Sequence, residues 1–521
     1  MAETSAASRP SSASARDPAY SSGPIVLVLA IILTIAAIQK SGPPPVVGAG
    51  APAVDFSAAR AMPDLREIAA RPHPLASVEN ARVRGYLVKR LTELGVAPEV
   101  QTATVAGVTR PGLRTFARVN NIVARIPGSA STGAIMLVAH YDSVPSGPGA
   151  GDDSAAVAAI LETIRAIKTG PPLRNDLIVL FTDGEELGML GAKAFVEHYA
   201  ALREVKVALN FEMRGDYGPV AMFQASADNA WLIHALAATP FPRASSLAPA
   251  AYRRLPNDTD LTVLLRAGIA GMNFAAIRGL TRYHTRLDNI AHLDPRSLQH
   301  EGSYALSLAR EFGGADLSRP HTRDAIYFSA FGGFFHYPAS MAMLLAILVS
   351  VVLLIALIGG IKRGSLSVGG ICSGFGIYAA AFVLSLVESR IVSSMFTHFA
   401  AHEMLPTRTS YGGAFFVAAS TAIVFATVCA IYWRLARYIS RANLAAGALA
   451  IWALLALLLS AVFPGGSYLL TWPLLFAALA LNFRWTMRQS RDPVPAIVAT
   501  LVAIIPCLVM IAPIFVSTGD A

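Results

Sequence analysis

Hydropathy divides this chain of 521 residues into two kinds of sequence. After about residue 337 six long apolar stretches follow one another, and none has a charged residue well inside it. Each is close to the ~20 residues that a helix needs to cross a bilayer. They lie at roughly 338–361, 366–387, 412–433, 443–463, 466–483 and 494–516. We therefore expect a membrane region of about six helices at 337–517.

The N-terminal part carries a shorter apolar run. Residues 1–23 are rich in Ser, Ala and Pro, which predicts a disordered tail. Residues 24–40 predict a transmembrane anchor, with a cleaved signal peptide as the alternative because Ala36-Ala37 could precede a cleavage site. Residues 41–55 are a Pro/Gly/Ala linker. Residues 56–325 have ordinary soluble composition and predict one soluble domain.

Basic residues between the spans predict the orientation. They concentrate after the first, third and fifth of the six spans, which makes those loops cytoplasmic by the positive-inside rule. These residues are Lys362 and Arg363; Arg434, Arg437 and Arg441; and Arg484, Arg488 and Arg491. With the anchor there are seven spans, the N-terminal tail is cytoplasmic, and the soluble domain lies on the other side. That side is the periplasm in a bacterium and an organelle lumen in a eukaryote.

Composition excludes two classes of function. The net charge of +9 comes largely from these loops, and no basic run is interleaved with aromatic residues, so nucleic-acid binding is excluded. The only cysteines are Cys372, Cys429 and Cys507, all within expected spans. The soluble domain therefore has neither a disulfide framework nor a thiol nucleophile.

Short β-type runs alternate with helical periodicity in the soluble domain. Strands are expected near 121–126, 134–139, 177–181 and 205–211, and helices near 153–168 and 186–200. This alternation predicts an α/β fold with a mixed, largely parallel sheet flanked by helices.

Histidine and carboxylate residues follow these strands. The segments are His140-Tyr141-Asp142, Gly151-Asp152-Asp153-Ser154, Gly184-Glu185-Glu186-Leu187-Gly188, Asn210-Phe211-Glu212 and Tyr283-His284-Thr285. Strand ends converge on one crevice in an open α/β sheet, and zinc prefers His nitrogen and carboxylate oxygen. Adjacent glutamates can supply one ligand and one general base. Singly, each residue also fits a structural role, such as a core histidine or a helix N-cap.

These motifs resemble the M28 family of di-zinc peptidases over about residues 60–312. The similarity is closest to its membrane branch, the Fxna-like endoplasmic-reticulum metallopeptidases and vacuolar membrane proteases. The resemblance implies that His140, Asp152 and Glu212 hold one zinc and that Asp152, Glu186 and His284 hold the other. It implies Glu185 as general base, Asp142 as the residue that orients His140, and Tyr283 as hydrogen-bond donor to the oxyanion.

The function implied is that of a membrane-bound peptidase, most readily an aminopeptidase, with a water bridging two Zn²⁺ ions. Its partners would be a peptide or protein substrate and the lipid bilayer, and the spans could also form a homodimer. Two alternatives stay open: a single-zinc enzyme similar to glutaminyl cyclases, and a non-enzymatic receptor or assembly factor. Many soluble family members have Asp where this chain has Glu212, so the first metal site could differ in metal preference.

Overall fold

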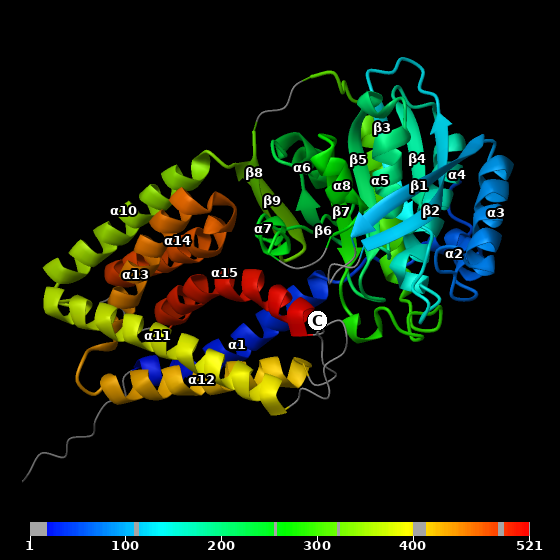
Figure 1. Cartoon of the computed structure of the whole chain (residues 1–521). Helices are drawn as coiled ribbons and strands as arrows, with labels where there is room; N and C mark the ends of the chain where they lie inside the picture. The colour runs from blue at the N-terminus through cyan, green and yellow to red at the C-terminus, as the bar shows by residue number, and fades with distance from the viewer. Residues whose placement is uncertain are drawn as a thin grey trace, which may run out of the picture.

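A seven-stranded mixed sheet forms the centre of the soluble domain (Figure 1). The computed structural model describes residues 18–108, 114–254, 258–319, 323–399, 413–487 and 494–519. The strand order is β1-β2-β4-β3-β5-β7-β6, and the central strands β4, β3, β5 and β7 run parallel. The strands are β1 (Pro98–Val108), β2 (Arg114–Ile126), β3 (Ala134–His140), β4 (Asp176–Thr182), β5 (Val205–Met213), β6 (Ala221–Ala225) and β7 (Ala270–Ala276).

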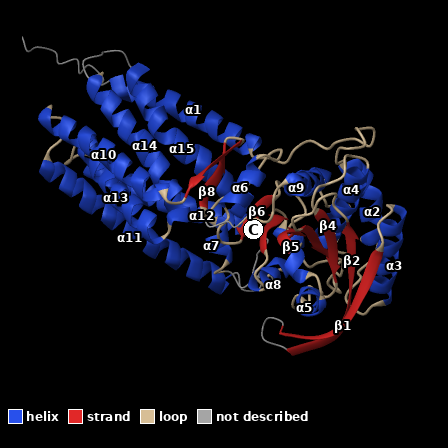
Figure 2. Cartoon of the chain, turned by 90° about the horizontal axis from the view of Figure 1, so that it is seen from above, coloured by secondary structure: helices blue, strands red, loops and turns tan. Residues whose placement is uncertain are grey.

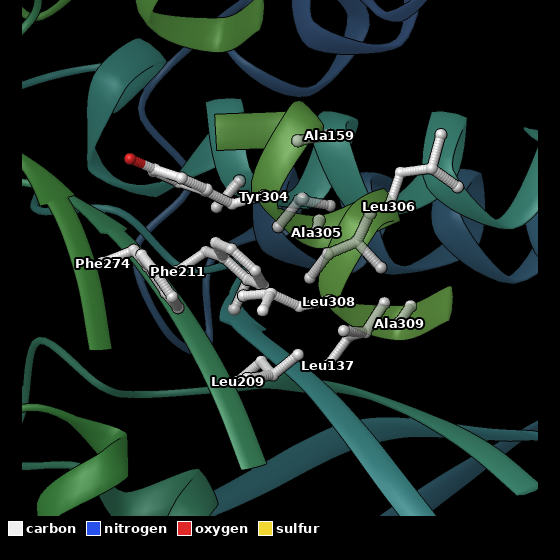
Figure 3. Packing of buried hydrophobic residues seen from close by; sticks show 14 of the residues in the cluster. Leu137, Ala159, Leu209, Phe211, Phe274, Tyr304, Ala305, Leu306, Leu308 and Ala309 are labelled. Carbon is white, nitrogen blue, oxygen red and sulfur yellow. The ribbon is translucent and has the colours of Figure 1, made fainter. Parts of the chain in front are cut away.

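Helices cover both faces of this sheet. One face packs on α2 (Ala58–Ile68), α4 (Ala156–Lys168) and α9 (Pro295–Gly314), and the other on α5 (Leu190–His198) and α8 (Asp260–Arg266). Figure 3 shows Leu308 and Ala309 of α9 against Leu137, Leu209 and Phe211 of the sheet. The central strands are apolar at nearly every position because both of their faces are buried. The predicted α/β fold class is confirmed.

The remaining helices of this domain are short or peripheral. They are α3 (Val78–Glu93), α6 (Ala230–Ala237) and α7 (Ala248–Tyr252), with single turns at Ala150–Ala155, Leu202–Glu204 and Leu280–Arg282. The expected helix over 186–200 begins only at Leu190, because Gly184 and Gly188 take left-handed backbone conformations and keep the preceding residues in a loop.

The Pro/Gly/Ala segment at 41–55 lies against the domain. The Arg60 guanidinium donates hydrogen bonds to the carbonyl oxygens of Ala49 and Ala51, and Arg165 donates to that of Ala53. The Val47 amide donates to Gln299 Oε1 at 3.0 Å. A segment whose composition predicts a flexible linker is therefore bound at several points.

A second sheet, the hairpin β8 (Ala325–Ala330) and β9 (Gly333–Pro338), connects the domain to the helical bundle. Ala325 and Tyr327 belong to the core of the soluble domain, whereas Ile326, Phe328 and Ala330 pack with bundle residues such as Tyr468. Figure 2 shows β8 between the two parts. Both faces of β8 are thus covered.

Seven helices of the described residues are long and apolar enough to cross a membrane, the number that the sequence predicts. They are α1 (Pro18–Lys40), α10 (Met341–Lys362), α11 (Val368–Phe399), α12 (Gly413–Leu435), α13 (Arg441–Val462), α14 (Pro464–Thr486) and α15 (Val494–Gly519). Helix α1 packs along α15 (Figure 1). Most of the tail expected at 1–23 lies outside the described residues, but residues 18–23 already belong to α1.

Helix α11 differs from the expectation. The span predicted at 366–387 continues as helix to Phe399, so Glu388 and Arg390 lie within a helix instead of a loop. The Glu388 carboxylate accepts a hydrogen bond of 2.8 Å from the Thr427 hydroxyl of α12. This hydrogen bond between helices offsets the cost of a carboxylate within an apolar helix. Hydropathy alone places the end of the span just before Glu388.

The candidate metal centre

Three neighbouring parallel strands place three of the predicted ligands at one edge of the sheet. His140 is the last residue of β3, and Glu212 is the penultimate residue of β5. Gly184-Glu185-Glu186 follows β4, where Gly184 has φ +76°. Because these strands run in the same direction, their carboxyl ends open on a common crevice.

His140, Asp152 and Glu212 form one group of candidate ligands. His140 Nε2 lies 3.0 Å from Asp152 Oδ1 and 4.0 Å from Glu212 Oε2. All three side chains are buried, with exposed fractions between 1% and 6%. This half of the centre is closed to solvent.

Asp152, Glu186 and His284 form the second group. His284 Nε2 lies 3.1 Å from Asp152 Oδ2 and 3.1 Å from Glu186 Oε2. The His284 side chain is 31% exposed, so this half faces solvent. Asp152 therefore contributes one carboxylate oxygen to each group and lies between them.

Glu185 belongs to neither group. Burial, together with the negative charge of Glu212, raises its pKa well above the usual range for a carboxyl group. A carboxylate beside candidate metal ligands, but outside both sets, is placed as a general base requires.

Asp142 acts on the site in two ways. Its main-chain carbonyl oxygen lies 2.9 Å from His140 Nδ1 and fixes the orientation of that ring. Its carboxylate accepts hydrogen bonds from the backbone amides of Glu185 at 3.0 Å and Glu186 at 3.4 Å. The Asp142 carboxylate Oδ1 is farther from His140 Nδ1, at 3.5 Å. The carboxylate thus chiefly holds the Glu185-Glu186 turn.

Two further aspartates shape the loops that carry ligands. Asp288 accepts hydrogen bonds from the amides of Gly151 at 2.6 Å and Asp152 at 3.2 Å. Asp216 pairs with Arg282, which precedes Tyr283-His284. At Gly279 (φ +84°) a Cβ atom would lie 2.0 Å from Asp216 Oδ1, so this close approach excludes any side chain.

Tyr283 stacks on His284 with ring centroids 3.7 Å apart, and the Arg214 guanidinium lies 4.9 Å from the Tyr283 centroid. Burial and the charges of Asp152 and Glu186 raise the pKa of the Tyr283 phenol well above its usual value. The phenol therefore stays protonated at neutral pH and remains a hydrogen-bond donor.

Negative charge exceeds positive charge in this crevice. Burial and Asp152 raise the pKa of Glu186 to about 7, and burial raises that of Glu212 to about 8. Burial opposes protonation of His284, but its hydrogen bonds to Asp152 and Glu186 outweigh burial and raise its pKa to about 10. Buried carboxylates in such number are stable when cations neutralise them.

Sequence reasoning did not assign Arg214 or Asp216. Both follow β5 directly, so the rule that strand ends border the crevice could have suggested them. Asp153 and Asp260 support the centre from behind: Asp153 accepts the His140 amide at 3.1 Å, and Asp260 accepts the Thr182 hydroxyl at the end of β4.

Comparison with known proteins agrees with this geometry. The sequence profile described as peptidase family M28 matches residues 121–309, which include every candidate ligand. These residues resemble the peptidase family M28. The match covers β3 to β7, the end of β2 and most of α9, and the bundle lies outside the matched residues.

Curated relatives are similar over a wider range than the M28 domain. A vacuolar membrane protease of Yarrowia lipolytica is 31% identical over 317 residues, which are 56% of this chain and 31% of that protein. One of Schizosaccharomyces pombe is 30% identical over 320 residues, covering 58% of this chain and 37% of the relative. The chain therefore spans about a third of the length of the relatives it matches.

Solved structures share more distant similarity. Porphyromonas gingivalis glutaminyl cyclase is 22% identical with a TM-score of 0.40, covering 49% of this chain and 99% of that one. A zinc aminopeptidase of Bacillus subtilis is 15% identical with a TM-score of 0.40, covering 50% and 96%.

Proposed function

We propose that this protein is a membrane-bound zinc metallopeptidase that hydrolyses peptide bonds as an aminopeptidase. One observation carries the proposal: Asp152 is common to two groups of candidate ligands, while Glu185 stands beside both and belongs to neither. The match of residues 121–309 to the peptidase family M28 also supports peptide hydrolysis.

The donor set fits two zinc ions. Each group offers one histidine nitrogen and two carboxylate oxygens, the donors that zinc takes in catalytic sites. Glu186 Oε1 is buried and has no hydrogen-bond partner among the described residues. Zinc bound here would supply Lewis acidity that polarises a carbonyl group and lowers the pKa of a water molecule.

Side chains of this protein would transfer the proton and bind the substrate. Glu185 would accept a proton from the attacking water and then donate it to the amine that leaves, so one proton is moved and none is lost. Tyr283 would donate a hydrogen bond from its hydroxyl group to the oxygen that becomes negative.

The test is Glu185→Gln in the full-length protein, loaded with zinc. We expect hydrolysis of aminoacyl and peptide substrates to fall by ~10² or more, while zinc content stays at two per chain, since Glu185 is in neither ligand group. Hydrolysis at the wild-type rate would contradict the assignment of the base.

Metal analysis separates the alternatives. One tightly held zinc per chain, with cyclisation of N-terminal glutamine and no hydrolysis, would indicate a glutaminyl cyclase-like enzyme. Zinc binding with neither reaction would indicate a receptor or assembly factor. Loss of only the first metal in His140→Ala and only the second in His284→Ala would support two separate sites.

We also propose that the peptidase domain, at about 56–325, faces the non-cytoplasmic side. The basic ends of α10, α12 and α14 lie away from the soluble domain, whose Ser246 contacts Gly465 at the other end of α14. The positive-inside rule then makes the basic ends cytoplasmic. Protease accessibility in sealed vesicles tests this orientation.

A further inference from the structure

A cavity of about 420 Å³ lies within the helical bundle, far from the metal centre. Four helices line it: α11 through Tyr378, α13 through residues around Trp452, α14 around Ala480 and α15 around Ala503. Its volume is in the range of pockets that hold small ligands. Alanines from three of the helices leave this space, because a methyl group cannot fill the distance between the helix axes.

The cavity begins at one end of the bundle and stops near its middle. On α14 its lining extends from Arg484, close to the helix end, to Pro473, a distance of ~16 Å along the helix axis. The other helices line it from the same end, because α11, α13 and α15 begin there. Half of the ~30 Å hydrocarbon core is ~15 Å, so the cavity is about one leaflet deep.

Among the described residues that line this cavity, Arg484 at its mouth is the only charged one. Arg484 is exposed there, and the deeper lining is aliphatic or aromatic apart from Thr500 and Cys507. The Trp452 indole N–H donates a hydrogen bond to the Tyr378 hydroxyl, so both polar groups already have a partner. Glu388 is the only carboxylate in the described residues after 339, and it is bonded to Thr427. A cationic side chain at the membrane surface beside an apolar cavity is complementary to a lipid, which has an anionic headgroup and an apolar acyl chain.

We infer that this cavity binds one anionic phospholipid from the leaflet opposite the peptidase domain, with an acyl chain between α13, α14 and α15 and the phosphate at Arg484. The cavity lies within the bundle at the end away from the hairpin β8–β9, so the lipid would bind independently of the proposed peptidase activity.

The test is native mass spectrometry of the purified full-length chain, incubated with phosphatidylglycerol or phosphatidylcholine of the same acyl chains. We expect one phosphatidylglycerol to be retained in preference to phosphatidylcholine. Arg484→Ala should reduce this preference about fivefold, the effect of losing one basic residue near a headgroup. Arg363→Ala is the matched control: Arg363 lies at the same end of the bundle, at the end of α10, and does not line the cavity.

Two filling variants test the acyl site. Ala480→Phe and Ala503→Phe, on different helices, should each abolish retention of the single lipid, and a folded variant is recognised by its unchanged gel-filtration volume. Equal retention of both lipids by the wild type, or an unchanged preference in Arg484→Ala, would overturn the inference. So would displacement of the lipid by inorganic phosphate or equal binding of oleate, which would indicate a free anion or a fatty acid.

Discussion

Phe328 of β8 and Tyr468 of α14 stack with ring centroids 4.6 Å apart and ring planes only 1° from parallel. The Tyr468 hydroxyl also lies 2.7 Å from the Ser245 hydroxyl, and the neighbouring Ser246 hydroxyl donates to the Gly465 carbonyl oxygen at 2.6 Å. Aromatic packing and hydrogen bonds at this contact therefore join the soluble domain to the bundle.

Tyr468→Ala should destabilise the full-length protein. Tyr468 is 2% exposed, and truncation of a buried aromatic ring costs about 3–5 kcal/mol. We expect a lower Tm by near-ultraviolet circular dichroism in detergent. Phe116→Ala, which removes a ring that is 74% exposed, should change stability by less than about 0.5 kcal/mol. Equal Tm values for the Tyr468 variant and the wild type would show that this contact does not join the two parts.

Asp142→Asn should separate activity from metal binding. The asparagine side chain can accept at only one oxygen, so one of the two amides of the Glu185-Glu186 turn loses its carboxylate partner. We expect kcat/KM to fall about 10–100-fold. The main-chain carbonyl that orients His140 is unchanged, so zinc content should persist. Zinc lost in proportion to activity would contradict this division of roles; Asp316→Asn, at an exposed site, is the control.

Removal of metal should destabilise the peptidase domain. Without cations the carboxylates of Glu185, Glu186 and Glu212 repel one another in a buried crevice. Saturation of one site at 100 times its Kd contributes about 2.7 kcal/mol. Dialysis against EDTA should therefore lower Tm and abolish hydrolysis, and Zn²⁺ should restore both. Mg²⁺ should restore neither, because it prefers six oxygen ligands. Full restoration by Mg²⁺ would refute a zinc centre.

Zinc affinity should rise with pH. In the metal-free site the pKa of His284 is raised to about 10, so this histidine is protonated at pH 7 and zinc must displace its proton. For each proton that zinc displaces, the affinity for zinc rises about tenfold with every unit that the pH increases toward that pKa. Competition with a chromophoric chelator between pH 6 and pH 8 measures this slope. An affinity that does not change over this interval would contradict it.

His300 should make the fold sensitive to acid. Burial lowers its pKa to about 3, and its Nδ1 accepts a hydrogen bond from the Val220 amide, which requires the neutral ring. Between pH 6.5 and 3 the unfolded chain binds a proton that the folded chain does not, so stability falls as pH falls, by up to about 4–5 kcal/mol. The stability advantage of wild type over His300→Gln should shrink across this window, as measured by denaturant unfolding. His292→Gln, at an exposed position, should show no such change relative to wild type.

The sequence predicted that the candidate ligands lie close together, because three of their motifs lie at the ends of parallel strands or directly after them. Central strands such as β3 and β4 are continuous apolar runs, and the parallel order that their alternation with helices implies brings His140 and Glu185 together. The resemblance already implied that Asp142 orients His140, but not that its main-chain carbonyl does so, since a main-chain carbonyl carries no residue identity. It did not indicate that the Asp142 carboxylate holds the Glu185-Glu186 turn. The hairpin β8–β9 was missed for another reason: residues of β8 are apolar on both faces, so no period of two is visible.

The two-faced burial of β8 determines where the chain can be divided. The M28 match ends at residue 309, and a soluble fragment cut there would lose Tyr327 from its own core. A fragment extended to Pro338 would keep that side chain but expose Ile326 and Phe328 to water. Both cuts expose or remove buried apolar side chains, so the protein is best studied with its helical bundle attached, or with polar residues substituted at Ile326 and Phe328.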